Sequence, residues 1–285
     1  MTNTSSQASQ QGLGQKGLGK NGRMVDASDV PSVPLSGDVA MPIVGFGTWR
    51  LRVRQACEAV RFALDTGYRH IDTATMYGNE AEIGRALGES GVDRRAVFVT
   101  TKLPAANVGR ERETLAASLR ALGTDYVDLW LVHWPPRGKP RPRTWREFLA
   151  AREEGLARAV GVSNYSIAQI DELAAATGQP PAVNQIPWSP RRHNPGLLVA
   201  HRERGVAVEG YSPLKGTDLK DPVLGEIASK HGVTPAQVVL RWHIEHEIVV
   251  IPKSAEPARI ASNLELFGFC LDPDEIARID GLSDR

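Results

Sequence analysis

The sequence of 285 residues has only two cysteines, Cys57 and Cys270, and no long apolar run. Two cysteines are too few for a disulfide framework or a cysteine-rich metal site, and they suit a reducing compartment. No stretch approaches the roughly 18 apolar residues of a membrane-spanning helix, and the N-terminus lacks the apolar segment of a secretion signal. We therefore expect a soluble, cytoplasmic protein with no membrane partner.

The chain also lacks an excess of charge of either sign. Its 34 Lys and Arg against 33 Asp and Glu give a formal net charge of +1, so no global field attracts nucleic acid. Hydrophobic residues make up 41% of the chain, which is enough to bury a substantial core. We expect a monomer that acts on a small molecule and has no nucleic-acid partner.

The first residues differ in composition from the rest. Residues 1–29 are rich in Gln, Ser, Gly and Asn and contain almost no large apolar side chains. They cannot offset their ordering entropy, so we predict a disordered tail over residues 1–29 and a folded domain over residues 30–285. Gly12 to Gly17 match the dinucleotide-binding pattern G-x-G-x-x-G. No buried strand precedes these glycines, so we discard the match.

A strand, a loop and an amphipathic helix recur in this order from Met41 onward. The spacing between strands is close to the ~30 residues of a strand-plus-helix unit. The eight predicted strands begin near Val44, His70, Val97, Val127, Ala159, Ala182, Ala207 and Ile248. Eight such units close most naturally into a (β/α)8 barrel, with its chemistry at the carboxyl ends of the strands. A doubly wound open sheet is the lesser alternative, because no glycine fingerprint follows the first strand.

Helix starts in the last third of the chain are marked by a capping side chain before a proline. These pairs are Asp221-Pro222, Thr234-Pro235 and Asp272-Pro273. Proline suits the first helical position because its missing N–H needs no partner there. The long interval between the last two strands holds two such starts. We therefore predict extra helices after the seventh strand and at the C-terminus.

Four side chains of complementary chemistry lie at the ends of three successive predicted strands. Asp72 and Tyr77 follow the second strand, Lys102 ends the third, and His133 follows the fourth. Each one alone has an ordinary explanation, such as a helix cap or a surface charge. Barrel geometry brings neighbouring strand ends together, however, so the four residues predict one catalytic site.

The chemistry of these four groups is that of a proton donor. A phenol has an ordinary pKa of ~10, and a neighbouring ammonium lowers that pKa by favouring phenolate. Lys102 supplies the cation, and Asp72 supplies the counter-charge that keeps Lys102 protonated. Tyr77 would then protonate a carbonyl oxygen that His133 holds in place. Such protonation indicates carbonyl reduction, with hydride arriving at carbon from a nicotinamide.

The chain resembles the aldo-keto reductases, and in particular short bacterial members similar to 2,5-diketogluconate reductases. The resemblance covers about residues 30–282. It rests on residues 41–49, 72–80, 102, 132–135, 161–165, 184–185, 211–214 and 251–254. It implies a (β/α)8 barrel with an N-terminal hairpin, NADPH bound without a separate dinucleotide-binding domain, and a catalytic tetrad of Asp72, Tyr77, Lys102 and His133.

The same resemblance implies the residues that hold NADPH. Ser163, Asn164 and Gln185 would bind the nicotinamide carboxamide, and Tyr211 would stack on the nicotinamide ring. The other cofactor-binding residues are Thr48, then Ser212 and Leu214 at the pyrophosphate, and Lys253, Ser254, Arg259 and Asn263 at the adenosine 2′-phosphate. A dianionic phosphate suits a guanidinium, an ammonium and hydroxyl or amide donors. NADPH is therefore expected in preference to NADH.

Tryptophans in the strand-end loops indicate where the substrate binds. Trp49 and Trp134, with Trp188 as a further candidate, would form an apolar wall beside His133. We assign the other tryptophans, Trp130, Trp145 and Trp242, to packing. Relatives with a selective pocket often have a longer C-terminal loop, so we expect an open pocket for aldehydes, ketones, keto sugars or keto acids.

Charged clusters outside the tetrad give weaker indications of function. Two basic segments near the rim would attract a substrate carboxylate or phosphate. They comprise Arg137, Lys139, Arg141 and Arg143 in one loop, and Arg191, Arg192 and His193 in another. His243, Glu245 and His246 lack the H-E-x-x-H spacing, so we read them as a polar helix end and expect no metal.

Two other functions stay open at this point. Lys102 could form a Schiff base in a barrel lyase, or the chain could be an NADPH-binding sensor or regulatory subunit. In the family, steroid double-bond reduction accompanies replacement of the tetrad histidine, and His133 argues against it.

Overall fold

The computed structural model describes residues 30–35 and 37–284, and the predicted tail, residues 1–29, lies outside them. Eight parallel strands follow one another in chain order around the sheet. They are β3 (Phe46–Gly47), β4 (His70–Asp72), β5 (Phe98–Leu103), β6 (Val127–Val132), β7 (Ala157–Ser163), β8 (Val183–Pro187), β9 (Ala207–Tyr211) and β10 (Val249–Val250). A parallel bridge between Val44, just before β3, and Val250 of β10 joins the two ends of the sheet. The (β/α)8 barrel is thus confirmed.

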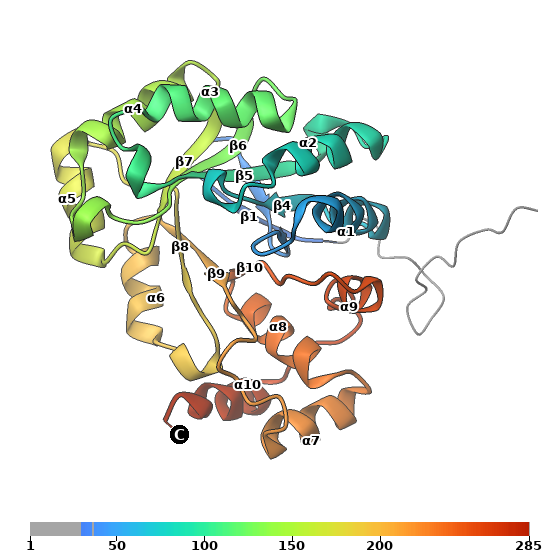
Figure 1. Cartoon of the computed structure of the whole chain (residues 1–285). Coiled ribbons are helices and arrows are strands. Elements are labelled where there is room, and N and C mark those ends of the chain that lie inside the picture. Colours follow the sequence, from blue (N-terminus) through green and yellow to red (C-terminus); the bar gives the residue numbers. More distant parts are fainter. Residues whose placement is uncertain (1–29, 36, 285) are drawn as a thin grey trace, which may run out of the picture.

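Helices cover the outside of the strands (Figure 1). They are α1 (Val53–Thr66), α2 (Glu80–Glu89), α3 (Glu111–Leu122), α4 (Pro142–Glu153), α5 (Ile167–Thr177), α6 (Pro195–Arg202), α7 (Pro222–His231), α8 (Pro235–Glu245), α9 (Pro257–Ser262) and α10 (Pro273–Asp280). The extra helices after the seventh barrel strand and at the C-terminus are confirmed. Asp221 accepts a hydrogen bond from the Val223 N–H, and Thr234 and Asp272 each form a capping box.

A short antiparallel hairpin precedes the barrel, as predicted. It pairs β1 (Ser32–Pro34) with β2 (Ala40–Pro42). Nδ1 of His70, the first residue of β4, lies 3.3 Å from the Pro42 carbonyl oxygen. A Cβ on Gly45 would lie 2.6 Å from the same Nδ1, so only glycine lets the chain pass His70 this closely. The hairpin therefore sits against the amino ends of the strands, opposite the predicted site.

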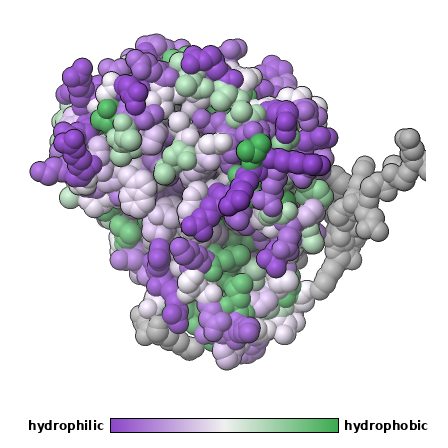
Figure 2. Space-filling view, viewed as in Figure 1, coloured by the Kyte–Doolittle hydropathy of each residue, from purple (hydrophilic) through white to green (hydrophobic). Residues whose placement is uncertain are grey.

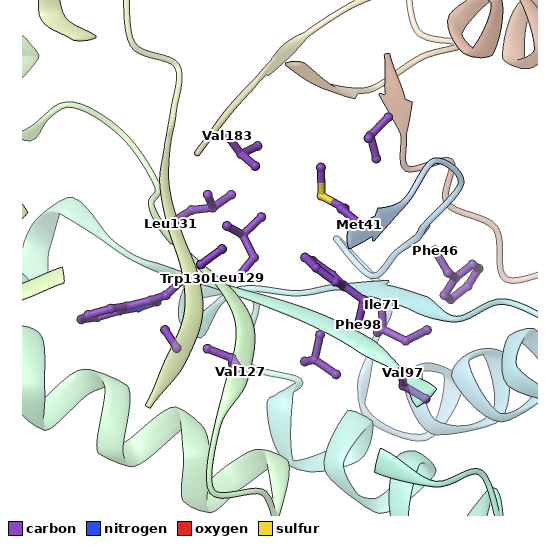
Figure 3. Packing of buried hydrophobic residues seen from close by; sticks show 14 of the residues in the cluster. Met41, Phe46, Ile71, Val97, Phe98, Val127, Leu129, Trp130, Leu131 and Val183 are labelled. Atoms are coloured by element: carbon purple, nitrogen blue, oxygen red, sulfur yellow. The ribbon is translucent and has the colours of Figure 1, made fainter. Parts of the chain in front are cut away.

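The barrel strands β4, β5 and β6 are buried along their whole length. Their apolar side chains join Met41 of the hairpin in one core cluster (Figure 3). Trp130 stacks on Phe148 of α4 with ring centroids 3.6 Å apart. Trp145 and Trp242 are also buried, which confirms the packing role of these tryptophans.

Hydrophilic side chains cover most of the outer face seen in Figure 2, where apolar side chains form only small groups. No helix within residues 30–35 and 37–284 combines the length and the apolar character needed to cross a membrane.

Buried histidines should make the fold sensitive to mild acid. Burial lowers the pKa of His70 and of His243 to about 4, from an ordinary value of 6.5. Below pH 6.5 these histidines become protonated in the unfolded chain but stay neutral in the folded protein. The free energy of unfolding should therefore fall as pH falls. The slope is about 1.4 kcal/mol per pH unit for each histidine. Glu209 has the opposite effect, because burial raises the pKa of its carboxyl to about 8. In this pH range the folded protein therefore holds one proton on Glu209 that the unfolded chain lacks, which cancels the contribution of one histidine to the slope.

The measurement is urea denaturation between pH 6.5 and 5, a window above the ordinary pKa of surface carboxylates. We expect the unfolding midpoint to decrease steadily across it. The histidines whose pKa is lowered, all with the same sign, are His70, His133, His193, His201 and His243. A constant or rising midpoint would show that they are not held neutral in the folded protein.

Candidate active site

A cavity of about 500 Å³ opens at the carboxyl ends of the strands, where barrel geometry places the site. Its wall includes most of the residues selected from the sequence. They are Trp49, Asp72, Tyr77, His133, Trp134, Ser163, Asn164, Gln185, Tyr211, Ser212, Leu214 and Lys253. The loops of seven different strands therefore converge on one pocket.

Lys102 and Asp72 form a fully buried ion pair beneath this pocket. The Lys102 Nζ donates to both carboxylate oxygens of Asp72 and to the Thr73 carbonyl, each at 2.7 Å. Burial by itself lowers the pKa of Lys102, but Asp72, Tyr77 and Glu209 together outweigh it and the net pKa is raised. Three acceptors occupy the three N–H groups, so Lys102 is a fixed ammonium.

Tyr77 lies on the turn after β4, directly above the ion pair. The Lys102 Nζ is 5.1 Å from the centroid of the Tyr77 ring. Burial raises the pKa of Tyr77, and the Lys102 charge lowers it only in part. The expectation of a net lowered pKa was therefore wrong for the protein without ligand, because burial of the phenol outweighs the ammonium. The sign of the Lys102 contribution is as expected.

His133 faces Tyr77 across the pocket, with ring centroids 5.7 Å apart. Burial, assisted by the Lys102 charge, lowers the pKa of His133 to about 3. The imidazole is therefore neutral at pH 7. Its Nδ1 is buried and has no hydrogen-bond partner among the described residues. A neutral imidazole can donate one hydrogen bond to a carbonyl oxygen without carrying charge into the pocket.

The residues expected at the nicotinamide lie together at the ends of β7, β8 and β9. Ser163 donates to the Gln185 carbonyl at 2.8 Å, and Tyr211 donates to the Asn164 side-chain oxygen at 2.8 Å. Asn164 has φ of 64° and Ser212 has φ of 55°. Non-glycine residues rarely adopt this left-handed region, and such strain concentrates at functional sites.

The residues expected at the 2′-phosphate lie in the segment after β10. Lys253 lines the cavity, whereas Ser254, Arg259 and Asn263 do not. Arg259 is exposed and pairs with Glu256 at 3.0 Å. Thr48, also expected to bind cofactor, is buried and donates its hydroxyl to the Asp72 carbonyl oxygen at 2.9 Å. Thr48 thus holds the backbone at the end of β4 in place through this hydrogen bond.

Two of the three candidate tryptophans border the pocket. Trp49 is 45% exposed and Trp134 is 50% exposed, and both line the cavity. Trp188 is 1% exposed and packs against the Gly210 backbone, so its assignment to the wall was wrong. Position in the loop after a strand does not show whether a tryptophan side chain faces the pocket or turns back into the core.

The two basic segments also contain both exposed residues and one residue that turns inward. The arginines and the lysine of both segments are exposed, and none of them lines the cavity. His193 instead turns inward, where its Nε2 lies 3.5 Å from Asp280. His246 also contacts Asp280, at 2.9 Å, and the three side chains form a group that could hold a metal ion. His193 is therefore not part of a basic rim, and the expectation of no bound metal stays a prediction.

Three contributors were not identified from the sequence. Met76 and Lys215 line the cavity, and Glu209 lies beneath it, fully buried. Lys215 follows the Ser212 to Leu214 segment, so its position beside a recognised motif was the available signal. Glu209 is two residues before Tyr211, and strand alternation alone would have pointed both side chains to the same side. A charged residue inside a predicted buried strand was the signal to follow.

The fold and site together define a barrel protein whose pocket holds a buried lysine–aspartate pair, a phenol and a neutral imidazole. Comparison with known proteins agrees with this description. The aldo/keto reductase family profile matches residues 43–284. An aldo-keto reductase of Mycolicibacterium vanbaalenii is 42% identical over 265 residues, which cover 92% of this chain and 95% of that protein. The chain belongs to the aldo/keto reductase family.

Other relatives support the same conclusion. A morphine 6-dehydrogenase of Pseudomonas putida is 41% identical over 273 residues, covering 90% of this chain and 92% of that protein. The crystal structure of an aldo/keto reductase from Brucella melitensis has a TM-score of 0.85 and 42% identity, covering 89% of this chain and 98% of that one. A Bombyx mori aldo-keto reductase in complex with NADP has a TM-score of 0.84 and 34% identity, covering 90% and 94%.

Proposed function

We propose that the protein reduces aldehydes and ketones to alcohols with NADPH, and that Tyr77 donates the proton. The observation that carries the proposal is the Asp72–Lys102 pair under the Tyr77 ring, with neutral His133 opposite. These groups surround one point of the pocket where a carbonyl oxygen would accept hydrogen bonds from the phenol and the imidazole.

The residues around the pocket fit NADPH by their donors and acceptors. Ser163, Asn164 and Gln185, at the ends of β7 and β8, bring amide and hydroxyl groups to the cavity wall, and Lys215 and Lys253 line it after β9 and β10. When bound, NADPH supplies hydride to the carbonyl carbon. The two lysines match the negative charge of phosphates, and the amides match a carboxamide.

Charge development explains the roles of the tetrad. As hydride reaches carbon, negative charge grows on the carbonyl oxygen, and the Tyr77 proton neutralises it. Lys102 then stabilises the phenolate that Tyr77 becomes, since its ammonium lowers the pKa of that phenol. Asp72 keeps Lys102 charged, and His133 orients the oxygen without competing as an acid. Each group thus acts most strongly in the transition state.

The same geometry argues against a Schiff-base lyase. A nucleophilic amine must be neutral and carry a free lone pair. Lys102 is buried, its pKa is raised, and its three N–H groups are held by Asp72 and Thr73. It cannot reach a substrate carbonyl without breaking that ion pair.

The proposed function is tested by mixing the purified protein with NADPH and a panel of aldehydes, ketones, keto acids and keto sugars, and following the nicotinamide absorbance. We expect NADPH consumption with several small aldehydes, because the pocket is lined by the exposed side chains of Trp49 and Trp134. Tight NADPH binding without turnover of any carbonyl compound would contradict the proposal and favour a sensor.

Cofactor preference should depend on Arg259. Arg259→Ala removes a guanidinium that is exposed and free to leave Glu256 for a 2′-phosphate, and charge-assisted hydrogen bonds are worth about 1.5–3 kcal/mol. We expect the Kd for NADPH to rise roughly ten- to a hundredfold, with the Kd for NADH unchanged. Fluorescence titration of both cofactors measures this.

The matched control is Arg54→Ala, another exposed arginine, which pairs with Glu58 on α1. It should leave both affinities unchanged. An equal loss for NADPH and NADH in Arg259→Ala would assign Arg259 to a part of the cofactor that the two share, not to the 2′-phosphate.

A further inference from the structure

A second carboxylate lies beneath the tetrad. Glu209 is 0% exposed and stands level with Gln185 on β8 and Val249 on β10. The Gln185 Nε2 donates both to Asp72 Oδ2 at 2.8 Å and to Glu209 Oε2 at 2.9 Å. One amide group therefore joins Glu209 to the catalytic ion pair.

The hydrogen bonds of Gln185 determine which way its amide faces. Its NH₂ group has two N–H donors, and both are used on the two carboxyl groups. The amide cannot be reversed there, because its oxygen would then meet two acceptors. Gln185 lines the cavity, and its side-chain oxygen, which has no hydrogen-bond partner among the described residues, is left to accept a hydrogen bond from a ligand N–H.

The surroundings of Glu209 also indicate its protonation state. Its Oε1 is buried, has no hydrogen bond among the described residues, and lies 3.6 Å from His70 Nε2. His70 Nδ1 faces the Pro42 carbonyl oxygen, which only accepts. Nδ1 therefore carries the proton of a neutral His70, and Nε2 is an acceptor, with the Thr100 hydroxyl 3.2 Å away as a donor to it. An ionised Glu209 would direct a second acceptor at it, whereas a protonated carboxyl directs a donor.

The charged groups around Glu209 come from two strands and one turn. His70 and Asp72 face it from β4, Lys102 from β5, and Tyr77 interacts with it from the turn after β4. The neighbouring β10 residues are valines and add no charge. Burial and the Asp72 charge raise the pKa of Glu209, the Gln185 hydrogen bond and the Lys102 charge lower it, and the net pKa is about 8.

We propose that Glu209 is a positioning residue that acts as a neutral carboxylic acid, fixing Gln185 for the nicotinamide carboxamide and leaving Asp72 as the only negative charge beside Lys102. This role rests on the proposed reductase function. It makes two separate demands on position 209. An acceptor must be present for Gln185, and the side chain must be uncharged at neutral pH.

The second demand has a measurable consequence in the reverse reaction. Oxidation of an alcohol requires Tyr77 as the phenolate base, so its rate rises with pH. In the wild type, Glu209 ionises first as pH rises, and its new negative charge makes Tyr77 hold its proton more tightly. An uncharged residue at position 209 should therefore move the rise in oxidation rate to lower pH.

Two variants separate the demands. Glu209→Gln keeps an acceptor for Gln185 and offers His70 an N–H, but never ionises. We expect near wild-type NADPH affinity and aldehyde reduction at pH 7, with the alcohol-oxidation profile displaced to lower pH by at least half a unit. Glu209→Leu removes the acceptor, lets the Gln185 amide rotate, and should weaken NADPH binding by roughly tenfold, the effect of one lost hydrogen bond.

Circular dichroism and thermal melting establish that each variant is folded, and Glu209→Gln decides the question even if Glu209→Leu does not fold. The proposal is overturned if the Glu209→Gln profile coincides with that of the wild type, or if this variant loses as much NADPH affinity as Glu209→Leu. If the wild type turns over no carbonyl or alcohol at all, the reductase function fails instead, and the NADPH affinities alone still test the positioning of Gln185.

Discussion

Tyr77→Phe should reduce the rate of carbonyl reduction by two to four orders of magnitude, while NADPH binds as tightly as before. The substitution removes only the hydroxyl group, and general acid catalysis contributes about 10²–10⁴-fold. The ring remains above Lys102 and opposite His133, so the shape of the pocket is kept. Single-turnover kinetics with preformed NADPH complex would measure the chemical step, and fluorescence titration would measure binding.

Tyr126→Phe is the matched control for this variant. Tyr126 stacks under Arg94 away from the cavity, and losing its hydroxyl should not change the rate. If Tyr77→Phe reduced aldehydes at the wild-type rate, the proton would have to come from another group, and His133 or a water molecule would be the next candidate.

Lys102→Met should abolish turnover and also destabilise the fold by about 3–5 kcal/mol, the usual cost of removing one partner of a buried ion pair. Asp72 would keep its bond from Gln185 but lose both bonds from Lys102. An unpaired carboxylate in the barrel core is far more costly than the methionine that replaces the lysine. Urea denaturation and steady-state kinetics measure the two effects.

The double variant Asp72→Asn with Lys102→Met tests whether stability and catalysis separate. It removes both charges, so most of the lost stability should return, because replacing both members of a buried pair is often neutral. Activity should stay absent, since no cation remains beneath Tyr77. Recovery of turnover in the double variant would show that the ammonium is not required for proton donation.

Much of this architecture could be predicted because local signals and topology agree. Strand starts such as His70 and Val127 are bounded by clear loops, and capping residues such as Thr234 precede a proline at the helix start. Once eight units are recognised, barrel closure places Asp72, Lys102 and His133 at one rim without further information. The grouping of these side chains could therefore be predicted from the sequence alone, while their catalytic role stays a prediction.

What could not be predicted depends on the balance of opposing effects or on the direction of a side chain. The pKa of Tyr77 is decided by burial against a single ammonium, and the sequence shows only the ammonium. Trp188 and His193 follow strand β8 like true pocket residues, yet both turn toward the packing between α8 and α10. The link between Glu209 and the site can be recognised only when the hydrogen-bond partners of Gln185 are known.

The most direct test of the account follows the transferred hydrogen. The enzyme is incubated with an aldehyde and NADPH carrying deuterium at the transferable position of the nicotinamide, and the alcohol product is analysed by mass spectrometry. One deuterium on the carbinol carbon for each NADPH consumed by the wild type, and at most about one-hundredth as much labelled alcohol from Tyr77→Phe in the same time, is the expected result. An alcohol without deuterium, or an unreacted aldehyde beside fully bound NADPH, would contradict the assignment of this pocket to carbonyl reduction.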